Sequence, residues 1–178
     1  MNSDSSPDNV TLTTKSLWIP ELGLKRRDYA SLHKSNSRLS ATVVDAAQKL
    51  LKQQFIAEGL QPSKTPWSEI CPVSGPAVQI HADIEGKHCF TSCYRGPLKQ
   101  VEAIYQNVVP DPLNNVVYVK DVKAPPEATN DCILYAIALA YEILSNGNPS
   151  CTFDNSKMRE HLVKCFIARK ITEFPKIS

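Results

Sequence analysis

The spacing of apolar residues changes several times along the chain, and the changes predict a mixed α+β fold. Residues 40–55 carry apolar side chains at the helical period, which predicts an amphipathic helix with one buried stripe: Val43, Val44, Ala47, Leu50, Leu51 and Phe55. Ser40 stands where an N-cap residue accepts a hydrogen bond from an unpaired backbone N–H. Before this helix, the charged run at residues 25–28 indicates a solvated face.

A proline-rich stretch at residues 61–76 predicts a connecting loop, because prolines at this density prevent a helix or a central strand. Four short runs after it alternate or are rich in β-forming residues, and we expect strands over residues 77–81, 88–94, 101–105 and 116–119. Gly86 indicates a tight antiparallel connection between the first two. A central, mostly antiparallel sheet packed by helices is therefore expected.

Two further helices are predicted to close the domain. Residues 132–141 are apolar on every side, which is typical of a buried helix, and Asn130 or Asp131 stands at its start. A helix over residues 155–170, capped by Asp154, has one apolar stripe: Met158, Leu162, Cys165 and Phe166. The order of elements predicts one α+β domain over residues 17–178, after a disordered, polar tail at residues 1–16.

Composition narrows the function classes. The 178 residues are 42% hydrophobic, and 20 Lys and Arg against 18 Asp and Glu leave a formal charge of +2, which argues against binding nucleic acid through bulk charge. The longest uncharged apolar run, residues 132–141, is about half the length needed to cross a membrane. The N-terminus has no secretory-signal pattern. We expect an intracellular protein, nuclear or cytoplasmic, with no membrane partner and its six cysteines reduced.

The cysteine spacing offers one weak metal-binding pattern. No CxxC pair occurs in the sequence. His161 and Cys165 could share one helix face as metal ligands. The favoured interpretation is that both lie on an apolar stripe, and that Cys89, Cys93, Cys151 and Cys165 are small core residues. We therefore expect neither a metal nor a cofactor.

The most distinctive chemical feature is Cys132, at the start of the predicted buried helix. Partial positive charge at a helix N-terminus lowers the pKa of a thiol, and first-turn N–H groups can hold an oxyanion. A thiolate nucleophile also needs a histidine to transfer protons, and His88 opens a predicted central strand. The alternative is a buried cysteine with a structural role only. His81 is expected to face solvent, and its use as the base in place of His88 is the lesser alternative.

These residues resemble the nucleophile helix of Ulp-type ubiquitin-like proteases, cysteine peptidases that cleave SUMO-like modifiers. Residues 130–140 (NDCILYAIALA) carry the most specific part of the resemblance. Residues 43–51, 78–81, 88–92 and 158–165 follow the family's order of helix, strand, histidine strand and closing helix. The chain more closely resembles a divergent set of such domains, often found in transposon-derived genes. The resemblance implies a cysteine-peptidase-like fold with the nucleophile at the N-terminus of a buried helix.

The resemblance places the nucleophile on Cys132 and the general base on His88. The family's aspartate, which orients the histidine, falls on Gln106, which cannot stabilise an imidazolium with a negative charge. Asn107 or Asp111 could take this orienting role, since an asparagine does so in papain-like enzymes.

Three further positions depart from the family. The glutamine of the oxyanion hole falls on Pro126, which has no side-chain donor, and the loss of one such donor costs about 3 kcal/mol. Ile133 replaces the glycine after the nucleophile, and Cys89 replaces the tryptophan after the histidine.

Preserved packing with altered chemistry favours a degenerate ubiquitin-like protease domain. In this interpretation the domain is a weak or inactive thiol peptidase that retains a Cys/His pair and binds a ubiquitin-like modifier as a monomer. The alternative is an active isopeptidase or endopeptidase that cleaves a SUMO- or ubiquitin-like C-terminal tail.

Overall fold

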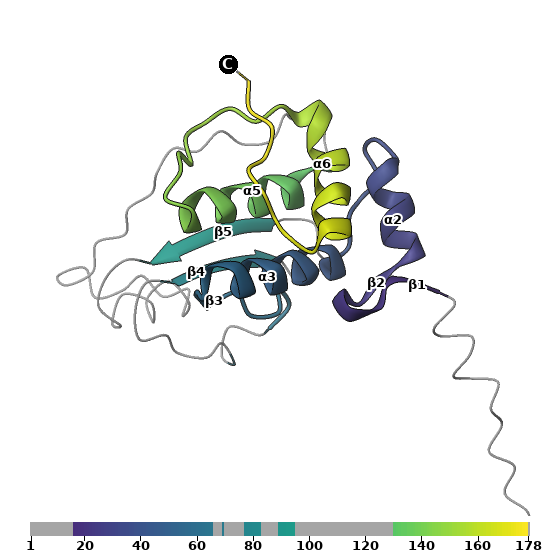
Figure 1. Ribbon diagram of the computed structural model, residues 1–178, viewed down its shortest axis with the longest axis horizontal. Helices are drawn as coiled ribbons and strands as arrows, with labels where there is room; N and C mark the ends of the chain where they lie inside the picture. Colours follow the sequence, from purple (N-terminus) through teal and green to yellow (C-terminus); the bar gives the residue numbers. More distant parts are fainter. Residues whose placement is uncertain (1–15, 66–68, 70–76, 83–88, 95–129, 178) are drawn as a thin grey trace, which may run out of the picture.

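The computed structural model describes residues 16–65, 69, 77–82, 89–94 and 130–177 (Figure 1). Within these ranges the chain forms four α-helices and two small sheets, one antiparallel and one mixed. The predicted α+β class is confirmed at this level. Residues 1–15 of the expected tail and the predicted strands at 101–105 and 116–119 lie outside the described residues.

The N-terminal part of the domain is a small hairpin followed directly by a helix. Strands β1 (Leu17–Ile19) and β2 (Leu24–Lys25) pair antiparallel around the 3-10 helix η1 (Pro20–Leu22), and α2 (Arg26–His33) follows. Asp28 is only 2% exposed, so the prediction of a solvated charged run is wrong at this residue. Its carboxylate accepts hydrogen bonds from the Lys25 N–H at 2.8 Å and the Ser40 hydroxyl at 2.7 Å.

Helix α3 (Ala41–Phe55) matches the predicted first helix, and its apolar stripe is buried. Ser40 is the N-cap residue, but its side chain does not cap the helix. The hydroxyl instead donates to Asp28, because the tertiary fold brings the start of α2 beside the start of α3.

The larger sheet has the order β3–β4–β5. Strand β4 (Ala77–Ala82) pairs antiparallel with β5 (Cys89–Tyr94), as predicted, with His81 opposite Phe90 and Ile80 opposite Thr91. Strand β3 (Glu58–Gly59) was not predicted, and it pairs parallel with β4, so the described sheet is mixed. A Cβ atom at Gly59 would lie 2.2 Å from the Val78 carbonyl oxygen, so this close approach requires glycine.

Two helices follow the sheet in the C-terminal half of the chain, and the first of them packs on the sheet. Helix α5 (Cys132–Leu144) lies along β5, and α6 (Asn155–Ala168) packs beside α5 (Figure 1). Both predicted helices are confirmed, and Asp154 caps α6 by accepting from the Ser156 N–H at 3.2 Å. No helix in the described ranges has the length and apolar character needed to span a membrane.

The segment after α6 contacts the end of α3 at Ile171 and then pairs with the loop before α6, where Lys176 lies opposite Phe153. Ile171 and Phe174 are buried in the core. The Gln54 side chain donates to the Ile171 carbonyl oxygen at 2.8 Å and accepts from the Ile171 N–H at 2.7 Å. This pair of hydrogen bonds fixes the C-terminal segment against the end of α3.

Ile56, directly after α3, has an unfavourable backbone conformation that can be tested by substitution. It adopts the left-handed region at φ 48°, although its side chain is β-branched and 93% exposed. Left-handed backbone costs L-residues about 1–2 kcal/mol, and asparagine tolerates it better. We expect Ile56→Asn to raise the free energy of unfolding by about 1 kcal/mol in urea denaturation.

Ile167, an exposed isoleucine within α6, is the matched control for this substitution. Ile167→Asn should not stabilise the protein, because the backbone there is helical. An Ile56→Asn variant no more stable than the parent would contradict the strain at this position.

Candidate functional site

Cys132 is the first residue of α5, so its predicted position at the start of the buried helix is confirmed. Its side chain is half-buried and packs against the hydrophobic core. Asp131 occupies the N-cap position, but its side chain makes no capping hydrogen bond. The helix start is therefore held by another interaction.

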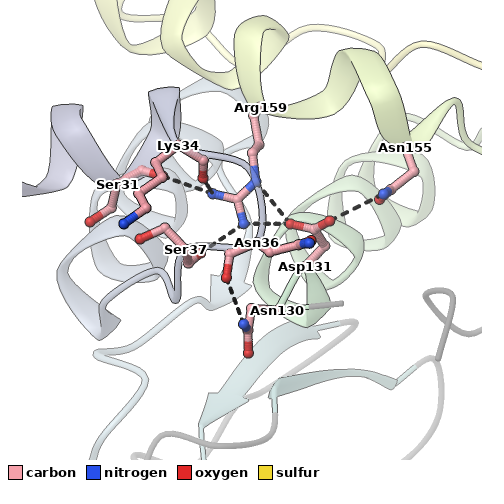
Figure 2. Close-up of polar contacts among 8 residues, drawn as sticks. All are labelled: Ser31, Lys34, Asn36, Ser37, Asn130, Asp131, Asn155 and Arg159. Atoms are coloured by element: carbon pink, nitrogen blue, oxygen red, sulfur yellow. Dashed lines mark hydrogen bonds and ion pairs between the residues drawn. The ribbon is translucent and has the colours of Figure 1, made fainter. Parts of the chain in front are cut away.

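That interaction is a buried ion pair between Asp131 and Arg159 of α6 (Figure 2). The guanidinium donates to Asp131 Oδ1 from Nε at 3.0 Å and from Nη2 at 2.6 Å. Asn155 Nδ2 donates to the other carboxylate oxygen at 3.1 Å. The side chains of Arg159 and Asp131 are 12% and 5% exposed, so water screens the pair weakly.

The remaining donors of Arg159 bind the loop after α2. Nη1 donates to the carbonyl oxygens of Ser31 at 2.8 Å and Lys34 at 3.2 Å, and Nη2 donates to Ser37 at 2.8 Å (Figure 2). Asn130 adds a hydrogen bond from its amide to the Asn36 carbonyl oxygen at 2.6 Å. One guanidinium thus joins α2, α6 and the residue before Cys132.

Strand β5 and helix α5 run side by side in the same direction (Figure 1). The Thr91 hydroxyl donates to the Ala136 carbonyl oxygen at 2.6 Å, so the backbones approach closely there. Cys89, two residues before Thr91, lies on the same side of β5, because strand side chains alternate. The start of β5 therefore lies at the same end of the sheet–helix layer as Cys132.

Most of the other predicted site residues fall outside the ranges that the structure describes. His88, Gln106 and Asn107 lie outside the described residues, as do Asp111 and Pro126. The pairing of Cys132 with His88 thus stays a prediction. Ile133, which stands where the family has glycine, is buried in the core.

The prediction that His81 faces solvent is wrong, because the residue is only 4% exposed. Its Nε2 lies 2.7 Å from the Ser92 hydroxyl, across the β4–β5 pair. Burial lowers the pKa of His81 to about 4, so the imidazole is neutral at physiological pH. The alternation of apolar and polar residues along 77–82 suggested one solvent-facing side, but the strand is buried on both faces.

His161 and Cys165 form a hydrogen-bonded group with Thr172. The Cys165 Sγ lies 3.4 Å from His161 Nε2 and 3.6 Å from the Thr172 hydroxyl. Burial acts to raise the pKa of Cys165, but hydrogen bonds to His161 and Thr172 outweigh it and lower the pKa overall. The hydrogen bond with Cys165 raises the pKa of His161. These contacts connect α6 to the C-terminal segment.

His161 and Cys165 were both predicted to lie on the apolar stripe of α6. The prediction is confirmed for Cys165, which is buried, whereas His161 belongs to a polar group. No cluster of three or more metal-ligating side chains occurs among the residues that the structure describes. Cys93 is exposed, so the prediction that it is a core residue is wrong, while Cys89 and Cys151 are half-buried.

No family model, curated protein or solved structure matches this chain. The resemblance to Ulp-type proteases thus remains an interpretation of the residues themselves.

Removal of Arg159 should destabilise the protein strongly. Arg159→Met leaves the Asp131 carboxylate buried without its cation, and breaking such a pair costs about 3–5 kcal/mol. We expect a loss of this size in the free energy of urea unfolding. The double variant Asp131→Asn, Arg159→Met should recover part of it, because no unpaired charge remains.

Lys164→Met is the control, since it breaks an exposed ion pair with Glu160 on the same helix and should change stability little. Equal, small effects of Arg159→Met and Lys164→Met would show that the buried pair does not hold the helices together.

Burial of His81 should make stability depend on pH. The folded imidazole stays neutral down to about pH 4, whereas the unfolded one, with a pKa of 6.5, takes up a proton earlier. The unfolded state therefore binds more protons between these values, and stability falls as the pH drops from 6.5 to 4. The expected loss attributable to His81 is on the order of 3 kcal/mol.

Thermal unfolding across this pH range measures the effect. The His81→Gln variant should lose stability less steeply with acidification than the parent, whereas His33→Gln, at an exposed site, should follow the parent. Identical slopes for the parent and His81→Gln would contradict a buried neutral imidazole.

Proposed function

We propose that this chain is a degenerate Ulp-type ubiquitin-like protease domain. It binds a ubiquitin-like modifier, and it hydrolyses the modifier's C-terminal tail slowly or not at all. The position of Cys132 as the first residue of the buried helix α5 is the observation that carries the proposal. A nucleophilic cysteine benefits from this position, because the helix dipole favours the thiolate and first-turn N–H groups face a developing oxyanion.

The surroundings of Cys132 support the proposal further. The network of Arg159 and Asp131 fixes the start of α5, and a nucleophile needs such a rigid support to keep its orientation. Cys132 is only half-buried, and a cysteine that attacks a peptide substrate needs such partial exposure. Strand β5 begins at Cys89, and His88 directly precedes it in the sequence.

In the reaction that the resemblance implies, the Cys132 thiolate attacks the carbonyl carbon at the end of the modifier. His88 takes the thiol proton and transfers it to the leaving amine. Gln106 in place of aspartate orients the imidazole without stabilising its charge, and Pro126 removes an oxyanion donor. Both losses slow turnover, while the binding of a modifier requires neither residue. We therefore expect the domain to bind a modifier even where it cleaves the modifier slowly or not at all.

The test combines a covalent probe with a binding measurement. The full chain is incubated with ubiquitin and SUMO vinyl-sulfone probes and followed by intact mass spectrometry, while binding of the unmodified modifiers is measured by biolayer interferometry. We expect micromolar binding of one modifier and an adduct that forms very slowly or not at all. Any adduct should disappear in Cys132→Ala and persist in Cys151→Ala, which changes another half-buried cysteine.

Two outcomes would change the conclusion. Rapid adduct formation at Cys132 would favour the alternative, an active cysteine-type isopeptidase on the same fold. The absence of both adduct and modifier binding would overturn the proposal.

A further inference from the structure

Two thiols mark the starts of the neighbouring elements β5 and α5. Cys89 is the first residue of β5, and Cys132 is the first residue of α5. Both are half-buried and pack against the same hydrophobic core. Because β5 and α5 run side by side in the same direction, their first residues lie at one end of the layer (Figure 1).

The Thr91–Ala136 hydrogen bond sets the register between the two elements. The bond is 2.6 Å long and joins a short side chain on β5 to the backbone of α5. Cys89 lies two residues before Thr91, which is about 7 Å along a strand. Cys132 lies four residues before Ala136, which is about 6 Å along a helix. The two cysteines are therefore level with each other.

The side chains also share a direction. Thr91 points from β5 toward α5, because its hydroxyl binds the helix backbone. Cys89 points to the same side, since residues two apart in a strand do so. Ser92, one residue further, contacts His81, which lies on the other side of the sheet, as alternation requires. On α5, Cys132 and Ala136 are four residues apart and so share one face of the helix.

We propose that Cys89 and Cys132 form an intramolecular disulfide when a peroxide oxidises the protein, and that this bond reversibly blocks the candidate nucleophile. A disulfide requires Cα atoms about 4–7 Å apart. The Thr91–Ala136 hydrogen bond brings the backbones of β5 and α5 close together one helical turn beyond the two cysteines. The bond itself depends only on the two thiols, whereas its regulatory effect rests on the proposed function.

Oxidation by a peroxide would form the disulfide in two steps. The Cys132 thiolate attacks one oxygen of the peroxide, the O–O bond breaks, and the products are a sulfenic acid at Cys132 and hydroxide or alkoxide, which takes up a proton. The Cys89 thiol then attacks the sulfenic sulfur, forms the S–S bond and releases water. The two thiols lose two electrons in total, and the peroxide gains them. A dithiol reductant reverses the change by thiol–disulfide exchange.

Cys93 provides a matched control on the same strand and the same side. It lies four residues beyond Cys89, which is about 13 Å further along β5, and it is exposed. Its distance from the start of α5 is too great for a disulfide with Cys132. Cys165 is held elsewhere, by hydrogen bonds to His161 and Thr172.

The experiment uses the reduced full chain and hydrogen peroxide. Remaining thiols are alkylated, the protein is digested without reductant, and linked peptides are identified by mass spectrometry. We expect a Cys89–Cys132 linked peptide, with alkylation of Cys132 reduced at least tenfold and restored by dithiothreitol. The linked peptide should be absent from Cys89→Ser and present in Cys93→Ser. Circular dichroism checks that both variants are folded, and Cys89→Ala serves as a second variant if Cys89→Ser is not.

Three results would overturn the disulfide: oxidation of Cys132 to a sulfinic acid without a link, a link from Cys132 to another cysteine, or unchanged alkylation of Cys132 after peroxide. Failure of the proposed function looks different, because it appears as lost modifier binding in the reduced protein. If the link forms but the reduced chain binds no modifier, the disulfide stands and its regulatory role is refuted.

Discussion

The guanidinium of Arg159 is the constraint on which the arrangement of the helices depends. It binds the Asp131 carboxylate and three carbonyl oxygens of residues 31–37, so it joins three helices that are distant in sequence. Buried charges cost several kcal/mol to desolvate, and the cost is offset only when every donor and acceptor has a partner. Arginine suits this position, because its planar fork of donors reaches several acceptors at once. The start of α5, and with it Cys132, is fixed as a consequence.

The interior of the sheet follows the same rule with uncharged groups. Buried Gln79 donates to Gln48 of α3 at 3.1 Å and to the Gln61 carbonyl oxygen at 3.0 Å, which joins the helix to the sheet. His81 is kept neutral by its burial and lies beside the Ser92 hydroxyl. Buried polar groups with partners specify one packing arrangement, because any shift in register would leave them unsatisfied. The candidate site is therefore built against a sheet whose register is defined.

The starts of α5 and β5 combine a well-packed core with unusual side chains for a protease site. Cys132 is the first residue of α5, and Ile133 next to it is buried in the core. Cys89 stands where the proposed family has tryptophan, and it places a second thiol at the same end of the layer as Cys132. If the proposed family assignment holds, the same residue that departs from the family pattern also supplies the second thiol of the proposed disulfide. The proposed function depends on the position of Cys132 at the start of α5, and the proposed disulfide depends in addition on the parallel course of β5 and α5.

Periodicity in the sequence determined the helices α3, α5 and α6 and the strands β4 and β5, because each has a strong apolar pattern and clear boundaries. Three features needed the tertiary structure. The parallel strand β3 has two residues, too few for any pattern, and only its pairing with β4 defines it. Asp28 and His81 are polar by composition, yet partners far along the chain or on the neighbouring strand allow their burial. Arg159 likewise resembles any charged residue on a helix, since its acceptors lie more than twenty residues away and meet it only when the chain has folded.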